Sequence, residues 1–179
     1  MYAIENEKIL ANVEFVGKRN IFGSVNKVLT PSSYRCNPKC NVYYQCGGCH
    51  LQHMTYEGQL QFKTNVVKKL YKEAGFENIK VNKCIGQDVP YFYRNKIQSP
   101  VKRSGKNIIA GFYKEDSHEI IPFDKCYVQD ELSNKIIKAV VVAMKENKIE
   151  PYNEDLETGI VRHILIRRAS KETMLVLVT

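Results

Sequence analysis

Four cysteines fall within fourteen positions of this 179-residue chain, in a segment with neither a helical nor a strand period. Three of them, Cys40, Cys46 and Cys49, have the spacing C-x5-C-x2-C. Gly47 and Gly48 separate the last two, and small residues there would let backbone amides approach the sulfur atoms and donate hydrogen bonds to thiolates. We therefore expect an irregular loop that is held in place by a bound metal or metal cluster.

The remaining cysteines bear on which group that loop would bind. The N-terminus carries acids where a signal peptide would be basic, and no run approaches the roughly 18 apolar residues of a membrane span. We expect a cytoplasmic protein without a membrane partner, in which thiols stay reduced. A fourth thiolate would complete either a zinc site or an iron–sulfur cluster, and spacing alone leaves both open. Cys126, after a predicted strand, is our choice; Cys36 is the alternative, and Cys84 is expected in the core.

The positive charge of the chain is gathered in three windows. Lysine and arginine outnumber aspartate and glutamate by 27 to 19, which gives a formal net charge of +8. Residues 15–56, 89–114 and 159–171 contain no acid but several Lys or Arg. Such windows favour a polyanionic partner, and RNA is the partner that we expect.

The second and third windows supply the candidate RNA contacts. Aromatic residues are interleaved with cations in the second window, a composition that binds single-stranded RNA by stacking and by phosphate contacts. Strand alternation would place Arg94 and Lys96 on one face, with Tyr93 on the other. The alternative is that the aromatic side chains are core and the cations a solvated face. The candidate residues are Tyr93, Arg94, Lys96, Lys102, Arg103 and Arg162.

Hydrophobic periodicity predicts two helices. The first begins at about Thr55, a suitable N-cap, and ends at about Ala74, with Gly75 in the C′ position. The second spans about 130–146, with Pro151 just beyond its end. Their expected inward faces are Tyr56, Leu60, Val67, Leu70 and Ala74 in the first helix, and Leu132, Ile136, Ile137, Val140 and Met144 in the second.

Short apolar or alternating runs predict the strands. Their expected ranges are 8–16, 22–29, 79–85, 92–101, 107–113, 119–123, 160–168 and 174–179. The last run is apolar almost throughout, which is typical of a strand buried on both faces. Because it stops at Thr179 without a turn or polar tail, we expect the chain to be part of a longer protein.

Several motifs in one colinear order resemble a known family. They are Cys40-x5-Cys46-Gly-Gly-Cys49, Tyr93-Arg94-Asn95-Lys96, and Gly159-x2-Arg162-His163. Over about residues 8–179 the chain is similar to the front part of bacterial RNA (uracil-5-)-methyltransferases, which act on 23S ribosomal RNA, with a related branch acting on tRNA. The resemblance implies that Cys40, Cys46, Cys49 and Cys126 bind a [4Fe–4S] cluster, and it favours the cluster over zinc.

The resemblance also implies a domain organisation and its limits. We expect an α+β fold with a partial OB-like (TRAM) β segment in residues 1–33, a cluster loop in 34–53, and a truncated central α/β RNA-handling domain in 54–179. The family's catalytic domain, with its S-adenosylmethionine site, has no counterpart here, so no catalytic residue is assigned and the chain alone is expected to be inactive. The expected state is a monomer that binds RNA, ribosomal rather than transfer. The alternative is a zinc-dependent nucleic-acid-binding module without enzymatic activity.

Overall fold

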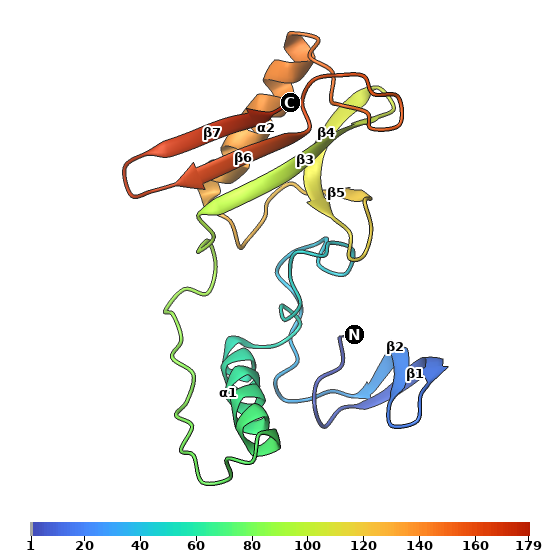
Figure 1. The fold of residues 1–179 in the computed structure, drawn as a ribbon, viewed down its shortest axis with the longest axis vertical. Coiled ribbons are helices and arrows are strands. Elements are labelled where there is room, and N and C mark those ends of the chain that lie inside the picture. Colours follow the sequence, from blue (N-terminus) through green and yellow to red (C-terminus); the bar gives the residue numbers. More distant parts are fainter. Residues whose placement is uncertain (1) are drawn as a thin grey trace. The chain divides into compact units, whose positions relative to one another are not determined.

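The computed structural model describes residues 2–179, which form two compact units (Figure 1). The first unit contains the chain up to Pro38 together with His50–Gln87. The second contains Lys39–Cys49 and Asp88–Thr179. Two helices and two antiparallel sheets make up the regular structure, so the expected mixture of helix and strand is confirmed.

A two-stranded sheet opens the first unit. Strands β1 (Lys8–Val16) and β2 (Ile21–Thr30) pair antiparallel, and the Gly17 backbone amide donates to the Asn20 carbonyl oxygen at 2.8 Å across the turn. Both strands lie where alternation predicts them. The pairing register shifts at three places, so the ribbon is irregular along its length.

Helix α1 (Tyr56–Glu73) has the predicted ends. The Thr55 hydroxyl accepts a hydrogen bond from the Gly58 amide at 3.2 Å, and Gly75 follows the C-cap with a φ of +85°. The prediction of its inward face is wrong in the second half of the helix, because Val67 and Leu70 are 41% and 59% exposed. The residues that α1 buries are Gly58 and Thr64.

The strand predicted over 79–85 does not form. This segment is irregular, and polar contacts with α1 hold it: the Cys84 amide donates to the Thr64 hydroxyl at 2.9 Å, and the Gln87 amide donates to the Tyr56 hydroxyl at 2.7 Å. Alternation makes a strand only where a neighbouring strand accepts its backbone hydrogen bonds. Cys84 is half-buried, so its placement in a core is wrong.

The second unit is built on a five-stranded antiparallel sheet. The strand order is β5-β4-β3-β6-β7, so β3 lies at the centre between β4 and β6. The strands are β3 (Lys96–Ser104), β4 (Asn107–Tyr113), β5 (Ile120–Pro122), β6 (His163–Arg168) and β7 (Thr173–Val178).

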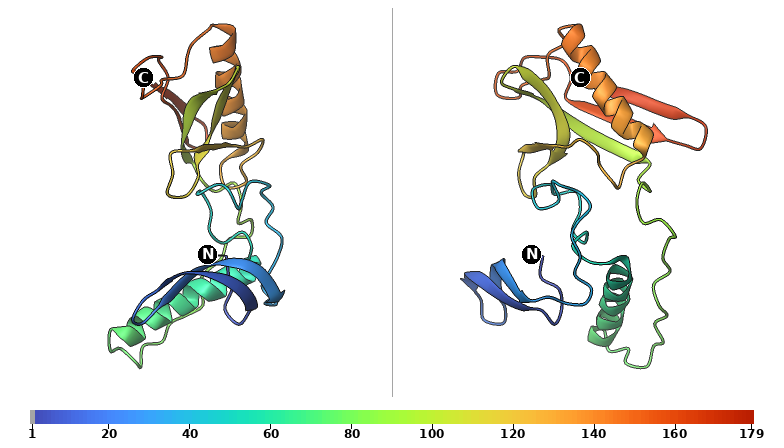
Figure 2. Two further views of the ribbon diagram at one scale, coloured as in Figure 1. Left: turned by 90° about the vertical axis from the view of Figure 1, so that its right-hand side faces the viewer. Right: turned by 180° about the vertical axis from the view of Figure 1, so that it is seen from behind.

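Helix α2 (Glu131–Glu146) covers one face of this sheet (Figure 2). The Asp130 carboxylate caps it by accepting from the Leu132 and Ser133 amides. Ile137 and Met144 are buried as predicted, whereas Leu132 is 41% exposed. Ile137 and Met144 pack with residues of the sheet and its neighbouring segments in one core cluster. Its buried members are Ile97, Val101, Ile108, Ile137, Met144, Val161, Ile164 and Ile166.

Two predictions about strands in this unit are wrong. Strand β3 begins at Lys96 rather than Phe92, so Arg94 lies outside it and makes only an isolated bridge with Gln129. Strand β7 is an edge strand whose residues Met174, Leu175, Val176 and Leu177 are 38–47% exposed, not buried on both faces.

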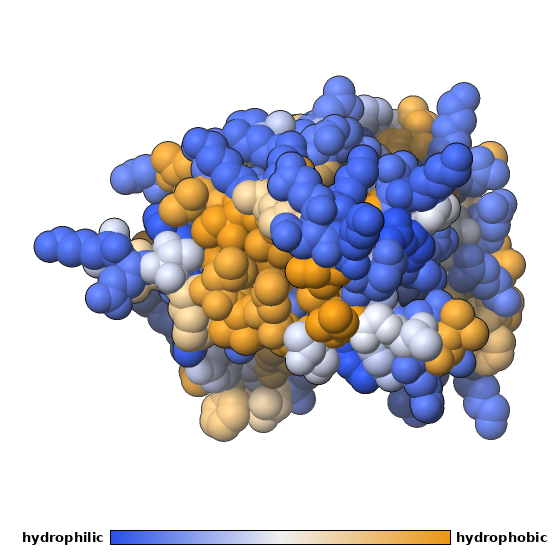
Figure 3. Space-filling model, turned by 90° about the horizontal axis from the view of Figure 1, so that it is seen from above, coloured by the Kyte–Doolittle hydropathy of each residue, from blue (hydrophilic) through white to orange (hydrophobic). Residues whose placement is uncertain are grey.

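Apolar side chains gather on the face of the molecule seen from above in Figure 3. Among the described residues, no helix is both long and apolar enough to cross a membrane.

Candidate thiol site and nucleic-acid interface

The loop Lys39–Cys49 folds onto the second unit through its backbone. The Cys46 amide donates to the Val42 carbonyl oxygen at 2.9 Å, which closes a turn inside the loop, and Tyr43 is only 1% exposed. The Gly47 amide donates to the Tyr113 carbonyl oxygen at the end of β4 at 2.9 Å. A Cβ on Gly47 would lie 2.9 Å from the Glu115 backbone nitrogen, so the close approach requires glycine.

One glycine amide points to sulfur. The Gly48 amide donates to Cys46 Sγ at 3.4 Å, which is the kind of contact that the Cys-Gly-Gly-Cys sequence predicts. Gly47 does not share this role, because its amide is bonded to Tyr113. The loop thus presents the Cys46 sulfur to a backbone dipole that stabilises a thiolate.

Cys126 lies in the later segment of the second unit, far along the chain from the loop. It is 9% exposed and follows β5 by four residues. The side chain of Asn134, on α2, binds its backbone at both ends: Oδ1 accepts from the Cys126 amide at 2.8 Å, and Nδ2 donates to the Cys126 carbonyl at 3.1 Å. Gln129, fully buried, donates to the same Oδ1 at 2.8 Å. A buried amide clamp therefore fixes the Cys126 backbone.

The residues next to Cys40 and Cys126 are also in contact, through a cation–π interaction. Lys39, next to Cys40, places its ammonium nitrogen 5.2 Å from the ring centre of Tyr127, next to Cys126. The same nitrogen lies 4.7 Å from the ring centre of Tyr91. Such cation–π contacts contribute about 0.5–1 kcal/mol each at exposed sites. They bring the loop and the segment after β5 together at the positions flanking the two thiols.

The pKa values of Cys40 and Cys46 are raised by burial and by other cysteines of the predicted set. Burial raises the pKa of Cys46 most, and the negative charges of Cys49, Cys126 and Cys40 raise it further, while the Gly48 amide opposes them. Burial likewise raises the pKa of Cys40, with a smaller contribution from Cys126. Thiols that oppose one another's ionisation are poor free thiolates, and a bound cationic group would relieve that repulsion.

No group of three or more His, Cys, Asp or Glu side chains within residues 2–179 is arranged to hold a metal ion. The alternative fourth ligand, Cys36, belongs to the first unit, where its thiol lies 3.6 Å from the Gln52 carbonyl oxygen. The ligand role of Cys40, Cys46, Cys49 and Cys126 stays a prediction. The thiolate chemistry, the sulfur-directed amide and the mutual repulsion fit a thiolate-bound group.

Three of the predicted RNA contacts line one hollow of the second unit, here called the Arg162 hollow. Its volume is about 370 Å³, and Lys102, Arg103 and Arg162 are among its lining residues. The Arg162 guanidinium carbon lies 3.6 Å from the ring centre of Tyr152, and Nη1 lies 3.7 Å from Glu154. Arg103 pairs with Glu150 through Nε at 3.0 Å. The hollow therefore combines cations with an aromatic face.

Tyr93 and Arg94 line a second hollow with Arg168, here called the Arg94 hollow, of about 320 Å³. Tyr93 is 57% exposed, and the Arg94 backbone pairs with Val128 and Asp130. Arg168 Nε lies 3.2 Å from the Asp130 carboxylate. The sixth candidate, Lys96, is exposed at the start of β3 but is not a lining residue of this hollow.

Several aromatic residues of the second window are engaged within the protein. Phe112 stacks on Phe123 at 5.0 Å between ring centres and packs against the core cluster. Phe92 has the Lys125 ammonium 5.1 Å from its ring centre. The stated alternative, core aromatics, therefore holds for Phe112. Sequence reasoning also missed Asn134 and Gln129, because only the tertiary fold brings their amides to Cys126.

Comparison with known proteins gives a consistent set of relatives. No model of a known protein family matches the chain. It is 43% identical over 99% of its length to an uncharacterised RNA methyltransferase of Clostridium acetobutylicum, 39% identical over 98% to one of Caldanaerobacter subterraneus, and 36% identical over 99% to one of Staphylococcus aureus. The chain spans about 40% of the length of these curated relatives.

A solved structure shows the same fold. The Pyrococcus abyssi tRNA (uracil-54, C5)-methyltransferase in complex with S-adenosyl-L-homocysteine superposes with a TM-score of 0.65 and 27% identity. The match covers 94% of this chain and 38% of that protein.

Proposed function

Because the chain is similar over nearly its entire length to proteins named RNA methyltransferases, we propose that it is the RNA-holding, cluster-bearing portion of an S-adenosylmethionine-dependent RNA (uracil-C5)-methyltransferase. The observation that carries the proposal is the similarity of 36–43% identity across 98–99% of the chain. The choice of uracil C5 and of the methyl donor is supported by the solved tRNA methyltransferase, which was crystallised with S-adenosyl-L-homocysteine. The opening strands β1 and β2 would then correspond to part of a TRAM domain.

Binding RNA is the task that this chain's own residues can perform. Modification of a base carbon requires the base to leave its stack, so the flanking RNA must be held while it does so. The Arg162 hollow suits that role, because Lys102 can approach a phosphate while the Arg162–Tyr152 stack offers a flat cationic surface. The Arg94 hollow adds the exposed ring of Tyr93.

The thiol site would hold a [4Fe–4S] cluster through Cys40, Cys46, Cys49 and Cys126. Bound there, the cluster would supply a covalent cross-link between the loop Lys39–Cys49 and the segment after β5. The residues of the chain already prepare that link: Asn134 fixes the Cys126 backbone, and the Gly48 amide faces the Cys46 sulfur. Such a cross-link would stabilise the loop against the segment after β5.

The cysteines provide their own matched controls for the cluster. Protein purified without oxygen should contain iron and acid-labile sulfide, and single Cys→Ser changes at Cys40, Cys46, Cys49 or Cys126 should abolish both. The same change at Cys36 or Cys84 should leave iron and sulfide unchanged, because these two thiols bond to nearby backbone carbonyls instead. Zinc without sulfide would contradict the cluster and favour the alternative, a zinc-dependent nucleic-acid-binding module.

The RNA part is tested by affinity and its salt dependence. Arg162→Ala or Lys102→Ala should weaken binding to RNA transcripts and reduce the slope of log affinity against log salt by about one each. Lys138→Ala removes an exposed charge from α2, outside both hollows, and should change the slope far less. Equal effects of all three changes would contradict a defined RNA surface.

The substrate that we propose is a uridine of 23S ribosomal RNA. Cells that lack the gene should lose 5-methyluridine from 23S RNA while their transfer RNA keeps it, as measured by mass spectrometry of purified RNA. Loss from transfer RNA alone would overturn the ribosomal assignment. No loss from either RNA would overturn the proposed methyl transfer.

A further inference from the structure

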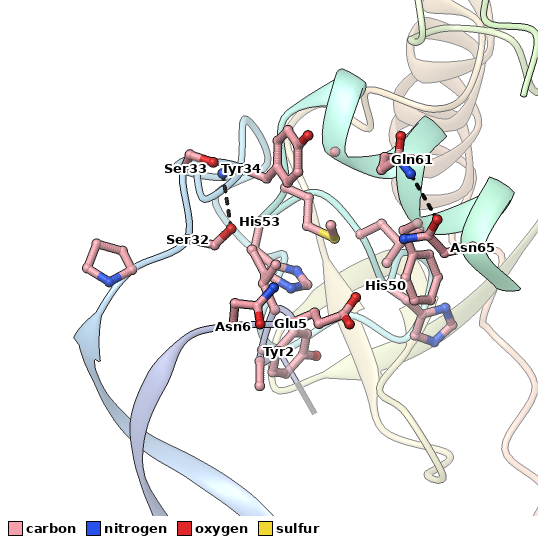
Figure 4. A pocket seen from close by; sticks show the side chains of 17 residues that line it. Tyr2, Glu5, Asn6, Ser32, Ser33, Tyr34, His50, His53, Gln61 and Asn65 are labelled. Atoms are coloured by element: carbon pink, nitrogen blue, oxygen red, sulfur yellow. Dashed lines mark hydrogen bonds between the residues drawn. The ribbon is translucent and has the colours of Figure 1, made fainter. Parts of the chain in front are cut away.

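The first unit contains a pocket that the proposed function has not used. Its volume is about 790 Å³, within the range of sites for small organic ligands. Figure 4 shows Gln61 and Asn65 of α1 on one side and Tyr2, Glu5 and Asn6 of the N-terminal segment on the other. We call it the amide pocket.

A partly buried ion pair fixes the walls of the amide pocket. Glu7 accepts hydrogen bonds from the Ile4 amide at 2.9 Å and from the Ser32 amide at 3.1 Å, and it pairs with Arg35. Arg35 in turn donates from Nη2 to the Tyr2 carbonyl oxygen at 2.7 Å. Because these bonds join the N-terminal segment to the turn before Arg35, two walls are held without a ligand. A preorganised site loses less entropy on binding.

The α1 wall presents a paired set of amides. Gln61 Nε2 donates to Asn65 Oδ1 at 2.8 Å, one helical turn along, which leaves a carbonyl oxygen of Gln61 and an amino group of Asn65 at the ends of the pair. Phe62 lies between them in sequence, lines the pocket and is 45% exposed. One acceptor, one donor and an aromatic surface are the groups that recognise a flat heterocycle by its edge and its face.

The charges that line the amide pocket disfavour phosphate. Neither Lys nor Arg is among its lining residues in the described chain, and Glu5 places a carboxylate there. Burial, and after it the Arg35 charge, lower the pKa of His53, which favours the neutral form of this lining imidazole. A carboxylate accepts hydrogen bonds from an exocyclic amino group, as it does from cytosine N4.

We propose that the amide pocket accepts one unpaired RNA base that carries an exocyclic amino group, while the phosphates flanking that base stay outside. This inference rests on the proposed RNA-binding function and adds a specificity site to it, remote in sequence from the cationic hollows of the second unit. Cytosine, adenine and guanine fit this requirement, and uracil does not.

The test uses the full chain with single-stranded oligocytidylate, oligoadenylate and oligouridylate. The first two should shift the side-chain amide NMR signals of Gln61 and Asn65. Glu5→Gln should weaken their binding about tenfold, as expected for loss of one base-edge hydrogen-bonding partner, and change oligouridylate binding less than about twofold. Asn65→Leu should weaken binding of oligocytidylate and oligoadenylate and leave oligouridylate binding nearly unchanged, whereas the matched controls Glu77→Gln and Asn78→Leu, on residues outside the pocket lining, should change none of the three.

Several outcomes would overturn the inference. If the two amide signals stay unmoved while Arg162→Ala still weakens RNA binding, the amide pocket is not a base site although the proposed function stands. If inorganic phosphate or ribose 5-phosphate shifts the same signals as strongly as oligocytidylate, the ligand is an anion or a sugar. If Glu5→Gln weakens all three oligonucleotides equally, the selectivity for an amino group is wrong.

Discussion

The two units are stabilised by different kinds of interaction. The second unit has an apolar core in which Ile164 and Ile166 are fully buried between α2 and the five-stranded sheet. The first unit leaves large apolar side chains of its two-stranded sheet exposed: Val13, Phe15, Val16, Ile21 and Phe22 are 57–70% exposed. The first unit also contains the Glu7–Arg35 ion pair. Similar apolar alternation thus gives a core only where another layer covers the sheet.

The largest expected effect is on the core of the second unit. Ile166→Ala should lower its free energy of unfolding by about 4 kcal/mol, because the side chain is fully buried and leaves a cavity. Leu70→Ala on α1, where the side chain is 59% exposed, should cost less than about 1 kcal/mol. Amide hydrogen exchange, which resolves each unit, measures both. Equal losses would contradict the contrast between the units.

The next effect concerns the ion pair of the first unit. Glu7→Gln should cost about 3 kcal/mol, because it leaves the Arg35 charge without its carboxylate. Hydrogen bonding to Arg35 is the main cause that lowers the pKa of Glu7 from 4.5 to about 2. A depressed pKa stabilises the folded state above about pH 4.5, and this contribution is lost as the pH falls towards 2.

Thermal unfolding followed between pH 2 and pH 6 tests this dependence. Stability of the first unit should fall with pH in the parent chain, and Glu7→Gln should flatten that fall. Glu73→Gln removes an exposed carboxylate that lies 3.8 Å from Lys69, and it should leave the profile as it is. A parent-like profile in Glu7→Gln would show that the ion pair does not hold the unit.

A smaller effect is expected from the amide clamp on Cys126. Asn134→Leu leaves a buried amide and a buried carbonyl of Cys126 without partners, at a cost of about 2 kcal/mol. Asn134→Asp keeps an acceptor for the Cys126 amide, so its free energy of unfolding should lie between those of the parent chain and Asn134→Leu. Denaturant unfolding gives the stability, and iron release to a chelator gives the effect on the thiol site. Unchanged iron release in Asn134→Leu would make the clamp structural only.

The smallest effect separates two adjacent glycines. Gly47→Ala should cost about 1.5 kcal/mol, because its Cβ would meet the Glu115 backbone at 2.9 Å. Gly48→Ala should be nearly neutral, since its Cβ would meet only the Cys46 sulfur at 3.4 Å. Stability of the two variants under denaturant, compared side by side, gives the difference. A larger loss at Gly48 would mean that the contact of its added Cβ with the Cys46 sulfur costs more than the contact of a Gly47 Cβ with the Glu115 backbone.

Local sequence signals predicted the ends of the helices closely. They failed for some strands, because strand formation and burial depend on which segments pack beside them. Thr55 and Asp130 mark the starts of the helices because their side chains accept hydrogen bonds from nearby backbone amides. Gly75 marks the end of α1 because glycine readily adopts a positive φ. The run 79–85 alternates like a strand but finds no strand beside it. Strand β7 is apolar from Met174 to Val178 but lies at a sheet edge.

The candidate sites divide in the same way. The cysteine spacing and Gly48 predict a thiol loop from sequence alone, because the residues that form this pattern are close together in the chain. The Asn134 clamp and the amide pocket join segments far apart in sequence, such as Tyr2 and Asn65, and no local pattern marks them. Lys102 and Arg162 were found by charge alone, although only the fold shows that they share a hollow.

The loop Lys39–Cys49 interrupts the first unit in sequence but belongs to the second. During translation, Cys40, Cys46 and Cys49 therefore leave the ribosome well before β4 and Cys126, which give the loop its place. At ordinary rates of synthesis, several seconds separate the emergence of these three thiols from that of Cys126. If the four thiols bind the proposed cluster, the complete set of ligands exists only after Cys126 has left the ribosome.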